Sequence, residues 1–200
     1  MLRLALKFII RLVLILPVSA CAFVDNQIQL EFEAPSATEG ATGNGETLVL
    51  ALFKDQRSDK LKIGVIKNGY GMETAKVLTK DDPAVWISNA IKSTLEAEGY
   101  SVESVPAGGT PPSNRLQLSG TVTKVYSEPK MGFWTATITG DVEALIQAQF
   151  RGQTTSKLIA GRSEETSMIT TGGDLHKRVL TSALDAFIKN FMSWFHSLRG

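Results

Sequence analysis

The chain has 200 residues, of which 43% are hydrophobic and 20% charged, so its composition excludes a disordered chain and a multi-span membrane protein. Its net charge is +1, and beyond the first twenty residues it carries 18 basic against 20 acidic residues. A nucleic-acid partner would require a concentrated basic surface. We therefore expect one near-neutral folded domain that does not bind nucleic acid.

Residues 1–20 have the three parts of an export signal. Basic residues come early, the apolar stretch FIIRLVLIL follows, and small residues from Val18 to Ala20 precede a cleavage point. The alternative is a transmembrane anchor, which needs about 20 predominantly apolar residues. Lys7 and Arg11 interrupt this stretch, so we predict a cleaved signal peptide.

Cys21, the only cysteine of the chain, follows this signal directly. The sequence VSAC resembles the lipobox of bacterial lipoproteins, which implies that Cys21 is the first mature residue and carries the acyl chains of a membrane anchor. Ala22, in place of the aspartate that retains such proteins in the inner membrane, implies the periplasmic face of the outer membrane. Each buried methylene contributes about 0.8 kcal/mol, so two or more chains hold stably. The alternative is an incidental cysteine in an export signal.

The next segments predict a strand, a loop and a second strand. From Ile28 to Ala34 apolar and polar residues alternate, which predicts a half-buried strand. The stretch SATEGATGNGE predicts a flexible loop, and the apolar run at 47–53 predicts a central strand covered on both faces. We therefore assign residues 21–46 to the lipidated N-terminus, first strand and loop, and residues 47–200 to the folded domain.

A helix is predicted over 83–98. Asp82 is a natural N-cap, Pro83 suits the first helical position, and Gly99 suits the C-terminal position that needs a positive φ. Apolar residues recur every four positions at Ile87, Ile91 and Leu95. A short strand over 100–105 and a loop rich in proline and glycine follow.

Two long alternating segments, 114–128 and 134–150, predict a hairpin with its turn at EPKMG. In the second segment the even-numbered residues, starting with Trp134, form the apolar face, and Gly140 is a candidate bulge or bend. A third strand is expected over 156–169. The last helix is expected to be capped by Asp174, with a buried stripe that runs from Leu180 to Leu198.

This order of elements predicts an α+β fold, with a single mixed, mostly antiparallel sheet and two helices packed on one face. The motif DQRSD at 55–59, after the central strand, and LEAEGYSV at the end of the first helix resemble the YajG family of lipoproteins. The resemblance covers roughly residue 47 to the C-terminus. That family has no assigned function, so the resemblance implies a fold and a cellular address.

Four residues are candidate contacts for a partner. Arg57 could bind an anionic group, or its own flanking carboxylates could hold it as part of the strand exit. Tyr70 and Met72 lie on a glycine-rich loop that could contact a partner or pack on its own domain. Trp194 lies off the main stripe of the last helix, where it could be exposed or could close the rim of the core.

The sequence offers no catalytic constellation. Two histidines at opposite ends of one helix, about 30 Å apart, cannot share a metal, and no nucleotide-binding or nucleophile motif occurs. We expect no enzymatic activity, no metal and no cofactor. The expected function is that of a lipid-anchored binding module, with an envelope protein or a glycolipid as its partner. The alternative is a lipid or glycolipid carrier, or an auxiliary subunit of an envelope transport system, which would need an apolar cavity between sheet and helices.

Overall fold

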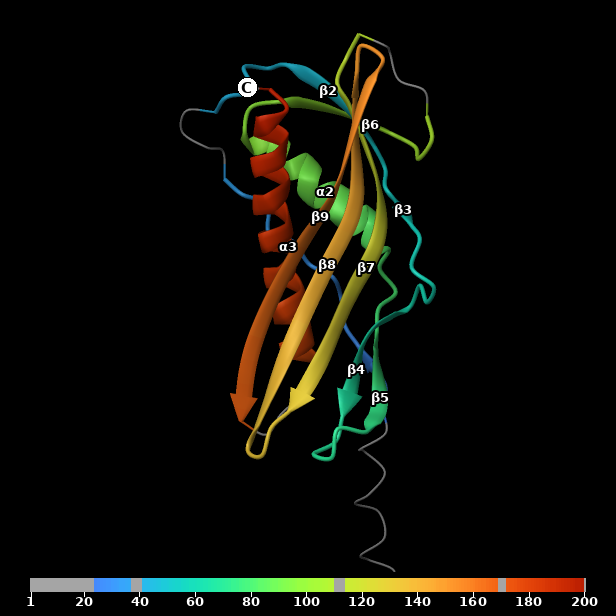
Figure 1. The fold of residues 1–200 in the computed structure, drawn as a ribbon, viewed down its shortest axis with the longest axis vertical. Helices are drawn as coiled ribbons and strands as arrows, with labels where there is room; N and C mark the ends of the chain where they lie inside the picture. Colours follow the sequence, from blue (N-terminus) through green and yellow to red (C-terminus); the bar gives the residue numbers. More distant parts are fainter. Residues whose placement is uncertain (1–23, 37–40, 110–113, 169–171, 200) are drawn as a thin grey trace, which may run out of the picture.

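The computed structural model describes residues 24–36, 41–109, 114–168 and 172–199, which form one open sheet and two helices (Figure 1). Residues 1–20 and Cys21 therefore lie outside the described residues. Within these ranges no helix is both long enough and apolar enough to span a bilayer. The elements are β1 (Asn26–Gln27), β2 (Thr47–Ala51), β3 (Lys54–Asp55), β4 (Lys62–Lys67), β5 (Glu73–Leu78), α2 (Pro83–Ala97), β6 (Ser101–Val105), β7 (Gln117–Met131), β8 (Thr135–Phe150), β9 (Gln153–Met168) and α3 (Gly173–Ser197).

The long strand β7 is the centre of the sheet. One edge of β7 pairs with β8 in antiparallel register from Gln117 to Met131, and β9 continues the sheet beyond β8. The other edge pairs in parallel with β2, β3 and β4 in succession. Strand β6 then extends the sheet beyond β2, whereas β5 and β1 extend it beyond β4. The predicted α+β fold with a mixed sheet is confirmed.

Both helices cover the same face of this sheet. Leu50, Leu118 and Ala148 are directly paired across β2, β7 and β8, so their side chains share one face. The three residues belong to one buried cluster that also contains the predicted stripes of α2 and α3. The fully buried members of those stripes are Ile87, Ile91 and Leu95 in α2, and Leu180, Leu184, Phe187, Phe191 and Phe195 in α3. The opposite face, here called the outer face, carries mostly polar side chains.

Two glycines bring α3 directly onto the sheet. A Cβ atom at Gly161 would lie 2.1 Å from the carbonyl oxygen of Ala183, and one at Gly140 would lie 2.7 Å from that of Val179. The expectation of a bulge at Gly140 is wrong, because this residue pairs in regular register with both neighbouring strands. Its glycine identity reflects the close approach of the helix. The bulge between β7 and β8 lies at 122–124.

The cap of α2 is as predicted. The Asp82 side chain accepts a hydrogen bond of 2.8 Å from the backbone N–H of Ala84, and Gly99 has a φ of +85°. The cap of α3 is not as predicted, since Gly172 occupies the N-cap position without a side-chain hydrogen bond. Asp174 lies instead in the first turn, where its negative charge interacts favourably with the positive end of the helix dipole.

The strand expected over 28–34 is a further correction. Only Asn26–Gln27 pair as a strand, in parallel with β5. The alternation still reports which side chains face inward, because Ile28 is buried in the core and Leu30 and Phe32 pack against it. The chain is held there by side-chain bonds, such as the one from Trp86 Nε1 to the carbonyl oxygen of Glu31. The packed unit thus begins before residue 47.

The hairpins also differ from the expectation. Residues 62–78 form the hairpin β4–β5, where the sequence analysis assigned no strand. The turn between β7 and β8 lies at 132–134, because Pro129 is still paired with Ile138 in the ladder. Trp134 is therefore a turn residue with 72% of its surface exposed, and it does not face the core.

Candidate functional site

The described chain begins close to the expected anchor. Val24 is three residues after Cys21, and Asn26 pairs in parallel with Val77 of β5. The backbone N–H of Lys76 donates a hydrogen bond of 2.8 Å to the Asp25 carboxylate, which ties this start to the same strand. The described chain therefore starts beside β5, three residues after Cys21 in the sequence.

Arg57 is part of the fold and has only 8% of its surface exposed. Its Nε and NH2 groups donate hydrogen bonds to the Asp55 carboxylate, and NH1 and NH2 also donate to the carbonyl oxygens of Lys62 and Lys60. Burial raises the pKa of Asp55, but hydrogen bonds and charge from Arg57 outweigh burial and hold that pKa below its usual value. This geometry corresponds to the structural alternative, in which the arginine fixes the chain after β3.

Tyr70 and Met72 are exposed at the turn of the β4–β5 hairpin, with 91% and 59% of their surfaces accessible. The sequence analysis missed their counterparts at the β7–β8 turn, Phe133 and Trp134, whose rings pack edge to face with centroids 4.9 Å apart. Adjacent aromatic residues were the available signal, because two neighbours in a strand cannot both face the core. We call residues 68–72 and 132–134 together the tip.

Trp194 is not a surface residue, so its assignment as a partner contact is corrected. Only 5% of its surface is exposed, and its ring lies 6.3 Å from that of Phe191 within the main core cluster. The apolar stripe of α3 widens at its C-terminal end, where Trp194 closes the rim of the core.

A serine and a histidine meet inside the domain. Ser127 Oγ donates to the carbonyl oxygen of Ile63 at 3.0 Å and lies 2.8 Å from His176 Nδ1. Since the single hydroxyl proton is used, Nδ1 of His176 acts as the donor to Ser127. Both residues have 0% exposure, so a substrate cannot reach this pair, which instead joins α3 to β7 and β4.

The interior between the sheet and the helices is filled by side chains. The largest fully buried ones are aromatic and come from α3, namely Phe187, Phe191 and Phe195, and Ile87, Ile91 and Leu95 of α2 lie beside them in one cluster. Backbone contact at Gly161 and Gly140 leaves α3 no separation from the sheet.

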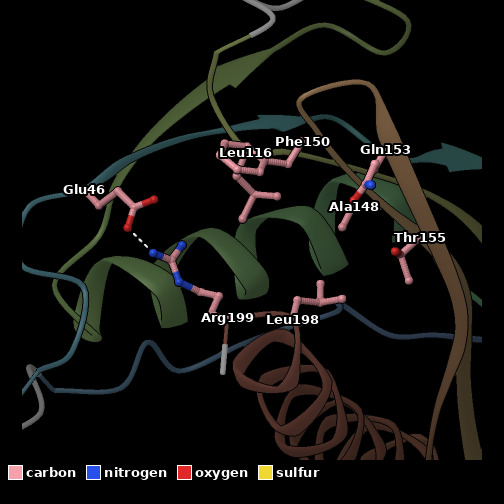
Figure 2. A pocket seen from close by; sticks show the side chains of 8 residues that line it. All are labelled: Glu46, Leu116, Ala148, Phe150, Gln153, Thr155, Leu198 and Arg199. Atoms are coloured by element: carbon pink, nitrogen blue, oxygen red, sulfur yellow. Dashed lines mark hydrogen bonds and ion pairs between the residues drawn. The ribbon is translucent and has the colours of Figure 1, made fainter.

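A pocket of about 360 Å³ opens at the end of the sheet where α3 finishes (Figure 2). We call it the end pocket. Its apolar lining comes from the inner face of the sheet and the end of the helix, and its polar lining comes from β9, from the residue before β2 and from the residue after the C-cap of α3. The lining residues are Glu46, Leu116, Ala148, Phe150, Gln153, Thr155, Leu198 and Arg199. A volume near 360 Å³ lies within the range that small ligands or side chains of a partner occupy.

Arg199 is the fixed charge of the end pocket. It forms an ion pair with Glu46, and its guanidinium carbon lies 5.2 Å from the ring centroid of Tyr100 and 5.8 Å from that of Phe195. The hydrogen bond to Glu46 raises the pKa of Arg199 above its ordinary value. The pocket therefore combines apolar walls with a positioned cation and carboxylate.

A second depression, of about 250 Å³, lies on the outer face of the sheet. Thr121, Gln147 and Lys54 are among its lining residues. Leu145, which also lines it, pairs directly with Leu158 of β9, and both leucines are exposed. Within the described ranges, no cluster of three or more His, Cys, Asp or Glu side chains has the arrangement of a metal site.

The described residues thus form a mixed α+β domain with open pockets on its surface. Residues 35–193 match the family described as "Uncharacterized lipoprotein", so the chain belongs to this lipoprotein family. No curated protein matches the chain. As a lipoprotein of this family, it is a membrane-anchored envelope protein of a class without an assigned activity.

Several solved structures are similar to this chain at low sequence identity. Protein XCC0632 from Xanthomonas campestris matches with 11% identity and a TM-score of 0.53, over 88% of this chain and 99% of its own. A Helicobacter pylori homolog of neuraminyllactose-binding hemagglutinin has 13% identity and a TM-score of 0.46, over 82% of this chain and 92% of its own. Lipoprotein GNA1162 from Neisseria meningitidis has 13% identity and a TM-score of 0.34, over 70% and 96%. The Xanthomonas protein supports the fold assignment alone.

Proposed function

We propose that this protein is attached by acyl chains on Cys21 to the periplasmic face of the outer membrane, and that its domain works by binding another component of the envelope. It acts without catalysis and without a cofactor. The partner is an envelope protein or a glycolipid, and the binding site is the end pocket together with its rim.

The single observation that supports this proposal best is the contrast between the interior and the end of the domain. Backbone contact at Gly161 and the buried aromatic side chains of α3 fill the space in which a carrier would hold lipid. The end pocket, in contrast, is accessible and offers apolar walls beside the Arg199–Glu46 pair. A preformed pocket with few positioned polar groups is typical of a recognition site.

The tether is tested by replacing its sulfur. In the variant Cys21→Ser we expect no incorporation of radiolabelled palmitate, because the serine hydroxyl cannot receive the thioether-linked diacylglycerol. The wild-type protein should incorporate the label and sediment with outer-membrane fractions. Labelling of the serine variant equal to that of the wild type would rule out the tether at this residue.

The binding site is tested by photo-crosslinking in cells of the native host. A photoreactive amino acid at Thr155, an exposed residue of the end pocket, should yield a discrete adduct of defined mass. The same amino acid at Lys189, an exposed residue of α3 that does not line the pocket and lies about 14 Å along the helix from Leu198, serves as the control. A third position, Gln147, reports on the depression of the outer face.

The three positions separate the outcomes. A discrete adduct at Thr155 that is absent at Lys189 supports the proposal. An adduct at Gln147 without one at Thr155 contradicts the assignment to the end pocket. Adducts with bulk lipid alone at every position contradict the interaction module and favour lipid handling.

A further inference from the structure

The tip consists of two hairpin turns that lie side by side at one end of the domain. Gly64 of β4 pairs in parallel with Ser127 of β7, so the two strands run together toward their turns. The Lys67 ammonium and the Glu128 carboxylate form an ion pair between these strands. Both turns accordingly appear at the lower end of Figure 1, opposite the C-terminal end of α3.

The tip exposes several large apolar side chains. Tyr70, Met72, Phe133 and Trp134 are all more than half exposed, and Met168 lies beside them because it pairs with Thr135 at the end of β9. Four large apolar side chains on two adjacent turns would be unfavourable in contact with water alone. Such a patch indicates a surface that is covered in the working protein.

The tip is free of negative charge. Its two segments, NGYGM and GFW, contain no Asp or Glu. The carboxylates nearest in sequence are those of Glu73, which pairs with Lys62 at 3.0 Å, and Glu128, which pairs with Lys67. Lys130 is exposed beside the β7–β8 turn. An anionic surface can therefore approach the tip without electrostatic repulsion.

The chain length from the anchor locates the membrane relative to the tip. Strand β1 is parallel to β5, and the pair Asn26–Val77 aligns Val24 with Ala75, three residues from Met72, or about 10 Å along the strand. Val24 is three residues after Cys21, and an extended chain covers at most about 11 Å over these three steps. The sulfur atom of Cys21 can therefore reach the level of the tip.

The short chain between Cys21 and Val24 also excludes an attachment to the membrane at the opposite end of the domain. Strand β8 has 16 residues, which corresponds to about 50 Å between the tip and the end pocket. A three-residue link from Val24 cannot bring Cys21 to the end pocket. Tyrosine and tryptophan are also the residues that favour the boundary between lipid headgroups and water.

The geometry points to the tip as a membrane-contact surface: the turns 68–72 and 132–134 rest on the phospholipid bilayer to which the chain is tethered. This inference depends on the proposed attachment at Cys21. It adds an orientation to that attachment, in which the long axis of β7–β9 leaves the membrane and the end pocket faces away from it.

The test uses the quenching of tryptophan fluorescence by lipids with brominated acyl chains. The full-length lipoprotein is purified from membranes, its acylation is checked by mass spectrometry, and it is reconstituted into vesicles of phosphatidylethanolamine and phosphatidylglycerol. The chain has three tryptophans, and Trp86 and Trp194 are buried at 6% and 5% exposure. We expect brominated lipid to quench the wild-type emission, and the quenching to be lost in Trp134→Phe.

Two further variants control for the location of the contact. Phe133→Ser should reduce the quenching of Trp134, because one of the aromatic anchors of the tip is removed. Leu158→Ser removes an apolar side chain that is 57% exposed on the outer face, and it should leave the quenching unchanged. Both positions are exposed, so neither change should impair folding.

The mass measurement reports on the tether, and the quenching reports on the tip. Acylated protein with unquenched Trp134 would overturn the membrane contact and leave the tether intact. An unmodified Cys21 would overturn the proposed attachment itself. A blue shift of Trp134 emission that grows with protein concentration at a fixed amount of lipid would assign the tip to contact between two copies, and would also overturn the inference.

Discussion

The contact between α3 and the sheet at Gly161 predicts how much stability the variant Gly161→Ala loses. The new Cβ atom would lie 2.1 Å from the Ala183 carbonyl oxygen and 2.2 Å from the Phe187 backbone nitrogen. Ordinary contacts of a Cβ atom are 3.4–4 Å, so helix and strand must separate by about 1 Å. The backbone of α3 is the obstacle, and it cannot rotate away as a side chain could.

The cost of this substitution follows from the packing that is lost. Overpacking of a filled core costs about 1–3 kcal/mol, and a rigid backbone obstacle places this site at about 3 kcal/mol or above. For a chain of this size, the melting temperature should fall by about 6–12 °C. The effect spreads along α3, because a gap of about 1 Å forfeits up to half of each dispersion contact.

Thermal unfolding followed by far-ultraviolet circular dichroism measures this shift. The matched control is Gly69→Ala, since an added Cβ atom at Gly69 has no neighbour within 4 Å, and its effect should stay within about 0.5 kcal/mol. A melting temperature of Gly161→Ala equal to that of the wild type would refute the reasoning. It would mean that α3 can move off the sheet at little cost, so that the interior has the free space that a carrier requires.

Two further predictions concern the acid side chains that organise the fold. Asp55→Asn should cost about 1–3 kcal/mol at pH 7, because the bonds to Arg57 lose their charge. The lowered pKa of Asp55 means that this contribution is present above about pH 4 and is lost as the pH falls through the lowered folded value. The difference between variant and wild type in urea unfolding should therefore shrink from pH 7 to pH 2, and a constant difference would contradict the assignment. Asp82→Ala removes the N-cap of α2 and should cost about 1 kcal/mol by the same assay, whereas an unchanged midpoint would show that the cap does not stabilise the helix.

The parts of the fold that local chemistry determines could be predicted from the sequence. Helix α2 was predictable because its cap, its first proline and its terminal glycine are all within one stretch of chain. The inward face of β8 was predictable from period-two alternation, which the sheet imposes over its whole length. The predicted buried stripes of both helices are confirmed, because apolar residues at helical spacing lie on one face of a helix.

The parts that depend on distant neighbours could not be predicted. Pro129 suggested a turn, yet it continues β7 in its pairing with β8. The pairing of β7 with β4 ends at Ser127. The missing N–H of Pro129 therefore removes no hydrogen bond between β7 and β4. Gly140 resembled a bulge, but the carbonyl of Val179 in α3 explains its lack of a side chain. The segment from Ile28 has strand periodicity without a strand partner beyond Gln27.

The candidate sites show the same division. The exposure of Tyr70 depends on the β4–β5 hairpin, which the sequence analysis did not assign. The end pocket joins Glu46, Thr155 and Arg199 from three distant parts of the chain. Trp194 is off the helical stripe in sequence but is buried by the sheet and by Phe191. The assignment of Cys21 stays a prediction, which rests on the local resemblance of VSAC to a lipobox.

The central claim is that acyl chains on Cys21 anchor the folded domain to a bilayer. Mass spectrometry of the protein extracted from membranes of its native host tests this claim most directly. We predict a mature N-terminal peptide that begins at Cys21 and carries the mass of a diacylglyceryl group together with an amide-linked acyl chain. A peptide that begins at Met1, or one that contains Cys21 with an unmodified thiol, would contradict the account.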